Sequence, residues 1–179
     1  MGIMPELPEV ETVRRGLKPF MLNKKIIQVI PEPGKGFYGS VTEVDGATVV
    51  DIRRKGKALL VDLDNGNTLM IHLRMTGQLI WRGKNAKVGQ VDDAEQFAAG
   101  HPSKNFTSEL PNKQTRVTFV FAEGKLFFND QRKFGFVKVL PTAEVESDKF
   151  IAELGKEPWD MSSDELYAKC QRHGRSPIK

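Results

Sequence analysis

Residues 57–73 read KALLVDLDNGNTLMIHL and contain two apolar runs that flank a turn signal. The runs Lys57–Leu63 and Thr68–Leu73 are rich in the apolar and β-branched residues that are typical of buried strands. Between them, the segment 64–67 (DNGN) supplies residue types that tolerate the backbone of a tight turn. The stretch therefore predicts a β-hairpin, and it favours an antiparallel sheet.

Similar short runs occur on both sides of this hairpin. Six more segments combine strand-forming residues with flanking Gly, Asn, Asp or Pro, namely Lys25–Ile30, Ala47–Ile52, Gly77–Trp81, Arg116–Phe121, Lys125–Asn129 and Gly135–Leu140. Eight predicted strands with mostly antiparallel connections are typical of a sandwich or a barrel. Near the start, Val10, Val13 and Leu17 follow Pro8 at helical spacing, so we expect one short amphipathic helix there.

The chain changes character in two places. Residues 82–115 lose periodicity and are rich in Gly, Asn, Lys, Ser and Ala, so we expect a loop insertion. From Ser147 the pattern turns helical, and the segment 162–165 (SSDE) before an apolar face is typical of a capped helix start. We therefore predict a mainly β (α+β) domain over residues 1–145 and a second, helical unit over residues 146–179.

Composition excludes several classes of protein. The 179 residues are 39% hydrophobic and 28% charged, which suits one ordinary domain and the start of a second. No apolar run approaches the ~18 residues that cross a bilayer, so we expect no membrane partner. The first residues, MGIMPELPEVE, lack the pattern of a secretory signal, which indicates a cytoplasmic protein. The single cysteine, Cys170, excludes an internal disulfide and a cysteine-rich zinc site.

The charge distribution permits a polyanionic partner. The net charge is +4, the sequence pI is about 9.2, and residues 53–57 (RRKGK) place four cations in five positions. This cluster predicts a local anion site. On charge alone, a solvated surface is the simpler interpretation.

Five motifs in order along the chain resemble the formamidopyrimidine-DNA glycosylases. They are residues 5–17 (PELPEVETVRRGL), 53–57 (RRKGK), 71–77 (IHLRMTG), 130–135 (DQRKFG) and 154–158 (LGKEP). The resemblance covers residues 4–179 and is weak in the insertion. It implies a two-sheet antiparallel β-sandwich followed by the start of a helix-two-turns-helix DNA-binding domain. It also implies a monomeric glycosylase and abasic-site lyase that removes oxidised purines from double-stranded DNA in the bacterial nucleoid.

The resemblance further implies three catalytic residues. Pro5 would be the nucleophile, because a secondary amine that attacks C1′ yields an iminium with no N–H to lose, which then drives strand-cleaving elimination. Glu6 would be the acid/base at the sugar, and Lys57, at the start of a predicted strand, would contact DNA and assist catalysis. The residues alone also allow a helix-start proline, a helix-dipole glutamate and a solvated lysine. For Glu9 and Glu11 the expected role is the helix-dipole one.

Another part of the resemblance concerns DNA contacts. Met75, Arg132 and Phe134 correspond to a flexible wedge, a donor for the orphaned base and a stacking aromatic, which together fill the gap left by an everted base. Three further residues, His72, Arg116 and Arg175, are candidate phosphate contacts. Taken singly, core or surface roles remain open for each residue. The complete set is His72, Met75, Arg116, Arg132, Phe134 and Arg175.

Two features depart from the family pattern. Residues 1–4 precede Pro5, so its nitrogen is an amide, and we expect the working enzyme to start at Met4 or to be processed there. The family continues past Lys179 with the rest of the helical domain and a four-cysteine zinc finger. Because Cys170 has no partner cysteine, we expect no zinc or other cofactor in this chain, and weak DNA affinity.

Two other interpretations stay open. A truncated, non-catalytic member of the same family would keep the sandwich and the basic strip and would bind DNA without forming a covalent adduct. An unrelated β-sandwich interaction module, with a tail that docks a partner protein, would bind no DNA even at low salt.

Overall fold

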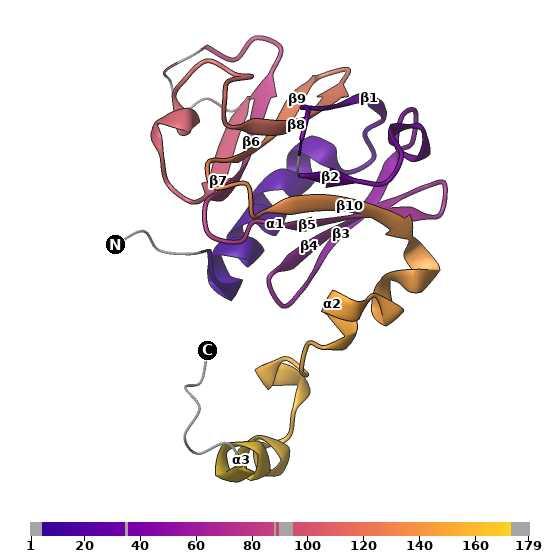
Figure 1. The fold of residues 1–179 in the computed structure, drawn as a ribbon, viewed down its shortest axis with the longest axis vertical. Helices are drawn as coiled ribbons and strands as arrows, with labels where there is room; N and C mark the ends of the chain where they lie inside the picture. The colour runs from indigo at the N-terminus through magenta and orange to yellow at the C-terminus, as the bar shows by residue number, and fades with distance from the viewer. Residues whose placement is uncertain (1–4, 35, 88, 90–94, 173–179) are drawn as a thin grey trace. The chain divides into compact units, whose positions relative to one another are not determined.

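The computed structural model describes residues 5–34, 36–87, 89 and 95–172. Contacts divide the chain into a first unit, Met1–Glu146, and a second unit, Ser147–Lys179. Among these described residues, the first unit contains one long helix and all the strands, and the second contains short helical segments (Figure 1).

Helix α1 (Leu7–Met21) opens the first unit and buries one apolar face. It begins after Glu6, whose backbone N–H donates to Oε2 of Glu9 at 3.0 Å. Pro8 lies in the first turn, where its missing N–H costs no helical hydrogen bond. The predicted amphipathic helix is therefore confirmed. Its buried residues are Val10, Val13, Leu17 and Met21.

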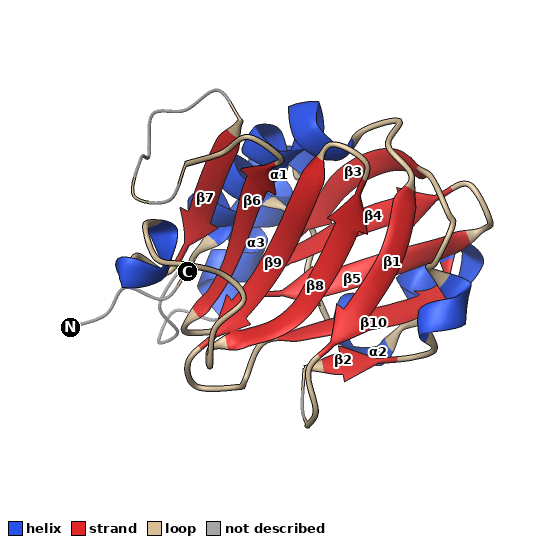
Figure 2. Cartoon of the chain, turned by 90° about the horizontal axis from the view of Figure 1, so that it is seen from above, coloured by secondary structure: helices blue, strands red, loops and turns tan. Residues whose placement is uncertain are grey.

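The strands described in the first unit form two five-stranded sheets. The strands are β1 (Ile26–Pro31), β2 (Phe37–Tyr38), β3 (Val49–Lys55), β4 (Ala58–Leu63), β5 (Asn67–His72), β6 (Gly77–Gly83), β7 (Gln96–Gly100), β8 (Thr115–Phe121), β9 (Gly124–Asp130) and β10 (Phe136–Pro141). One sheet has the order β1-β8-β9-β6-β7 and the other the order β2-β10-β5-β4-β3. The two lie as layers, one in front of the other, in Figure 2. Only the β10–β2 pair is parallel among the named pairs of described residues, so the two-sheet antiparallel sandwich is confirmed.

The hairpin predicted from residues 57–73 forms β4 and β5 near the centre of its sheet. The two strands pair from Ala58↔His72 to Asp62↔Thr68. Nearly every residue of both strands is buried, which explains why their sequences are continuous apolar runs rather than alternating ones. Apolar residues of α1 join those of both sheets in one core.

Strands β2 and β7 were not among the eight expected strands. Strand β2 has two residues, too few for a sequence pattern. Strand β7 lies inside the expected loop insertion and pairs with β6 from Gln78↔Gly100 to Arg82↔Gln96. Its sequence, QFAAG, has no β-branched residue, so pairing with β6 overrides a weak local preference.

The second unit contains α2 (Lys149–Ala152) and α3 (Ser163–Arg172). The N–H of Glu165 donates to Oγ of Ser162 at 3.2 Å, and the N–H of Ser162 donates to Oε2 of Glu165 at 3.1 Å. The capped helix start is therefore confirmed, while the helix-two-turns-helix domain stays a prediction. In the part of the chain that the structure describes, no helix combines the length and apolar character needed to cross a bilayer.

Candidate functional site

The fold brings Lys57 to Glu6. The ammonium Nζ of Lys57 forms an ion pair with Oε2 of Glu6, and the two side chains are 30% and 39% exposed. Glu6 is the residue before α1, and Pro5, which is buried, precedes it. The three residues implied as catalytic therefore lie together, two because they are neighbours in sequence and the third because of the fold.

Lys57 lies in the turn between β3 and β4, not at the start of a strand as predicted. Lys55 pairs with Ala58, so Gly56 and Lys57 are the two turn residues. Gly56 has φ 54°, a left-handed conformation that favours glycine at the first position of such a turn. The turn places Lys57 at the tip of the hairpin, where its ammonium reaches Glu6.

The other cations of the 53–57 cluster are paired with carboxylates. The hydrogen bond from Asp62, the largest influence, raises the pKa of Arg53 above its ordinary value. The cluster thus mainly joins elements, and Lys57 is its member beside Glu6. The pairs are Arg53 with Asp62 (2.6 Å), Arg54 with Glu11 (3.4 Å) and Lys55 with Glu146.

His72, the last residue of β5, is buried and neutral. It is 7% exposed, its ring stacks on Phe136 with centroids 5.8 Å apart, and its Nδ1 accepts the N–H of Arg74 at 3.0 Å. Burial, followed by the charges of Arg74 and Lys57, lowers the pKa of His72 from 6.5 to about 4. Because Nδ1 is an acceptor, the proton is assigned to Nε2. A phosphate would therefore meet a neutral N–H donor and not a cation.

Two neighbouring loops carry the three predicted base-gap residues. Met75, between β5 and β6, is 39% exposed, and Phe134, between β9 and β10, is 56% exposed. The guanidinium of Arg132 lies over the Phe134 ring, 5.1 Å from its centroid. Exposed large apolar side chains in adjacent loops are typical of a contact surface.

A buried carboxylate ties these two loops together. Asp130 is 1% exposed and accepts hydrogen bonds from Thr76 Oγ1, from the N–H of Arg132 at 3.1 Å and from the N–H of Gly135 at 2.7 Å. It thereby connects the loop of Met75 to the loop of Arg132. The only sequence signal for this role is its place at the head of a loop motif, where an aspartate side chain folds the turn that follows it.

Arg116 lies in β8 and is 8% exposed. Its Nε donates to the carbonyl of Asp130 at 3.0 Å, and its Nη2 donates to the carbonyl of Lys113 at 2.9 Å. This geometry favours a structural role, and the phosphate contact stays a prediction. The other arginine among the candidate phosphate contacts, Arg175, lies outside the described residues.

The residues present do not fit the four-cysteine zinc finger that the resemblance places past Lys179. It needs four cysteines, and the sequence has one, Cys170, which is exposed on α3. Within the described ranges, no group of three or more His, Cys, Asp or Glu residues could hold a metal ion. We therefore assign no step to zinc.

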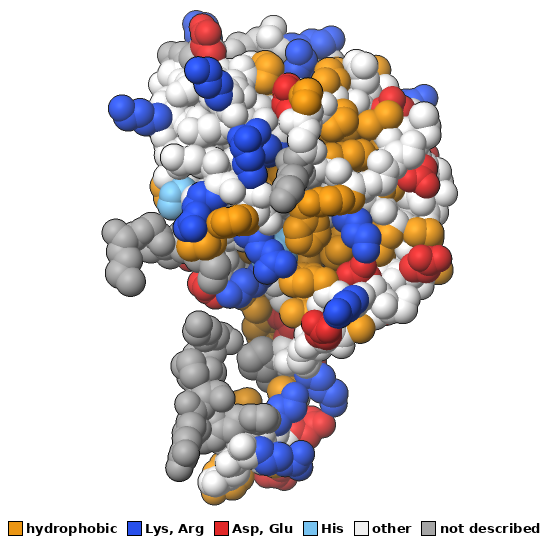
Figure 3. All heavy atoms as spheres, viewed as in Figure 1, with side chains coloured by type: hydrophobic (Ala, Val, Ile, Leu, Met, Phe, Trp, Pro, Cys, Tyr) orange, Lys and Arg blue, Asp and Glu red, His pale blue; other side chains and the backbone are white. Residues whose placement is uncertain are grey.

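The face of the first unit in Figure 3 mixes Lys and Arg side chains with exposed hydrophobic ones. Cations suit the phosphates of a nucleic acid, and apolar groups suit its unstacked bases.

Comparison with known proteins points to one family. Residues 4–137 match the family described as "Formamidopyrimidine-DNA glycosylase N-terminal domain". Curated proteins named formamidopyrimidine-DNA glycosylase from Dinoroseobacter shibae and a Ruegeria species are 36% and 37% identical to the chain over 184 and 182 residues. Each alignment covers 98% of this chain and 59% of the relative, so the chain spans about three fifths of the length of these relatives.

Solved structures agree with this assignment. A complex of Lactococcus lactis Fpg with DNA containing an abasic site has a TM-score of 0.73 at 28% identity, covering 94% of this chain and 57% of that one. A variant of the same protein bound to DNA containing Fapy-dG has a TM-score of 0.73 at 29% identity, covering 94% and 56%.

Proposed function

The chain belongs to the formamidopyrimidine-DNA glycosylase family, and we propose that it is the catalytic part of a DNA repair glycosylase that also cleaves at abasic sites. Its substrate is double-stranded DNA that contains oxidised purines or abasic sites. The observation that carries the proposal is the ion pair between Lys57 and Glu6, directly beside Pro5. In this proposal, the protein acts as a monomer on DNA in the cytoplasm.

The nucleophile in this proposal is the nitrogen of Pro5. In the sequence Met4 precedes Pro5, so the nitrogen is an amine only in a chain that starts at Met4 and loses it, or that is processed there. The amine attacks C1′ of the damaged nucleotide, the bond from C1′ to the base breaks, and the base leaves with the electron pair and takes up a proton. The proline nitrogen, now bonded to C1′, then passes its own proton to the Glu6 carboxylate and has a lone pair on nitrogen.

Ring opening and strand cleavage follow at the same sugar. The carboxyl group of Glu6 protonates O4′ as the bond from C1′ to O4′ breaks, which leaves a cationic iminium between Pro5 and C1′. The iminium accepts the electron pair released when a proton leaves C2′, and the phosphate on C3′ then departs. Lys57 contacts a DNA phosphate and orients the Glu6 carboxylate.

Access to C1′ requires that the damaged nucleotide leave the base stack. Extrusion costs a few kcal/mol, and inserted apolar and aromatic groups recover part of that cost. The exposed Met75 and Phe134 supply such groups, and Arg132 supplies donors to the orphaned base. His72 contributes its Nε2–H to a phosphate.

Trapping with borohydride tests the proposal. A chain that begins at Pro5, incubated with an abasic-site duplex and sodium borohydride, is expected to form a stable covalent adduct. Pro5→Gly should weaken adduct formation, and Glu6→Gln should abolish strand cleavage. If the Pro5 chain forms no adduct, catalytic competence is refuted.

A non-catalytic DNA-binding role is the second candidate, because the nitrogen of Pro5 is acylated in the sequence as it stands. Both candidates predict DNA binding that weakens with salt. Only the enzyme predicts an adduct, so the same trapping experiment separates them.

A further inference from the structure

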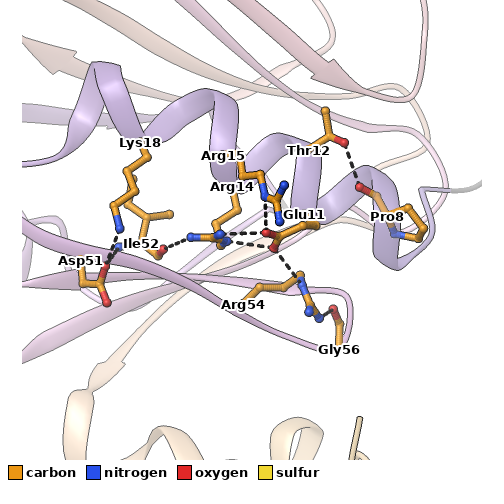
Figure 4. A network of polar contacts seen from close by, with 10 residues as sticks. All are labelled: Pro8, Glu11, Thr12, Arg14, Arg15, Lys18, Asp51, Ile52, Arg54 and Gly56. Atoms are coloured by element: carbon orange, nitrogen blue, oxygen red, sulfur yellow. Dashed lines mark hydrogen bonds and ion pairs between the residues drawn. The ribbon is translucent and has the colours of Figure 1, made fainter. Parts of the chain in front are cut away.

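Three arginines share the carboxylate of Glu11 on α1 (Figure 4). Arg14 binds it twice, from Nε to Oε2 at 2.9 Å and from Nη2 to Oε1 at 2.7 Å. Arg15 donates from Nε to Oε1 at 2.7 Å, and Arg54 donates from Nε to Oε2 at 3.4 Å. The Arg14 hydrogen bond is the largest influence that lowers the pKa of Glu11 from 4.5 to about 2. Glu11 is therefore ionised at neutral pH.

Arg54 connects this carboxylate to the turn that carries Lys57. Its side chain, on β3, is 10% exposed, and its Nη1 donates to the carbonyl of Gly56 at 2.7 Å. One guanidinium thus binds an α1 side chain and the backbone next to Lys57. A planar guanidinium holds two acceptors in a fixed geometry, which a lysine ammonium does not.

Together with the backbone, these contacts form a closed series of connections that begins and ends at Glu6. Helix α1 connects Glu6 to Glu11, and Arg54 connects the Glu11 carboxylate to the Gly56 carbonyl. Gly56 precedes Lys57 in the turn, and Nζ of Lys57 pairs with Glu6. The lysine side chain is long and flexible, so the place of its ammonium depends on where the turn holds its backbone. The Glu11–Arg54 link sets that place relative to α1.

We propose that Glu11 is a positioning residue which, through Arg54 and the Gly56 carbonyl, holds Lys57 against Glu6. The role in catalysis rests on the proposed function. A helix-dipole role alone would leave Glu11 without a contact outside α1, whereas the Arg54 contact joins it to another element.

Asp51 provides a matched control for this inference. It also joins β3 to α1, through Lys18 at 3.5 Å, and lies at the other end of the strand from the turn. Asp51→Asn therefore removes a similar tie between the same elements without touching Gly56 or Lys57.

Single-turnover cleavage of an abasic-site duplex, at saturating concentrations of a chain that begins at Pro5, tests the inference. Glu11→Gln is expected to lower the rate constant about tenfold, because a small misplacement of a catalytic group is costly, while the Kd for the duplex changes little. Arg54→Lys should reproduce the loss, and Asp51→Asn should not. Once Lys57 is replaced by Ala, Glu11→Gln should cause little further loss, because its effect acts through Lys57.

Full additivity of Glu11→Gln and Lys57→Ala would overturn the inference, as would an unchanged rate for Glu11→Gln. If Asp51→Asn lowers the rate constant as much as Glu11→Gln does, the inference is also overturned, because any contact between β3 and α1 would then have the same effect. A crystal structure of the Glu11→Gln variant supplies a readout that does not need activity, since the Lys57–Glu6 ion pair should be broken. An intact Lys57–Glu6 pair in that variant refutes the inference. By contrast, the proposed function is refuted if the unsubstituted chain that begins at Pro5 forms no adduct with borohydride.

Discussion

At the scale of single residues, His72 makes stability depend on pH. Its folded pKa of about 4 lies below the ordinary 6.5, so between these values the unfolded chain binds a proton that the folded chain excludes. This contribution is fully present above pH 6.5 and is lost as the pH falls toward 4, by up to ~3 kcal/mol. Urea unfolding at pH 7.5 and pH 5 should therefore show a larger drop in the free energy of unfolding for the natural chain than for His72→Gln. The same drop in both proteins would contradict the buried, neutral state of His72.

At the scale of elements, the contact between α1 and β7 depends on Gly16. A Cβ at this position would lie 2.0 Å from Cε2 of Phe97, and the Phe97 ring is held in a stack with Phe20 at 6.4 Å. Alanine normally favours a helix over glycine by ~1 kcal/mol. Gly16→Ala is nevertheless expected to reduce the free energy of unfolding by about 1–3 kcal/mol, because the ring or the helix must move.

A double-mutant cycle checks this expectation. With Phe97 replaced by Ala, the obstruction is gone, so Gly16→Ala should become neutral or stabilising by up to ~1 kcal/mol. A destabilisation of equal size in both backgrounds would show that Phe97 does not cause it.

At the scale of the whole molecule, the first unit contains its own apolar core. All buried members of the core cluster lie between Val10 and Val139. Glu146 pairs with Lys55 on β3, so it belongs with this unit. A fragment of residues 5–146 is therefore expected to fold alone, with near-UV circular dichroism and one cooperative urea transition. A fragment without near-UV signal would show that its core needs the second unit.

The sequence by itself determined the elements whose signals are local. The helical spacing of Val10, Val13 and Leu17, the turn at 64–67 and the Ser162–Glu165 cap each lie within a few residues, so the chain's own stereochemistry reveals them. The ordered motifs also identified the family. Strand β7 escaped prediction because its pairing with β6, and not its composition, makes it a strand.

Only the tertiary structure decided which charged groups meet. The 53–57 cluster reads as a run of equivalent cations, yet Arg53 pairs with Asp62, Arg54 with Glu11, and Lys57 with Glu6. Asp130 likewise joins two loops that are far apart in sequence. The physical reason is that an ion pair or hydrogen bond acts over a few ångströms, and those distances exist only after helix, strands and turns have packed.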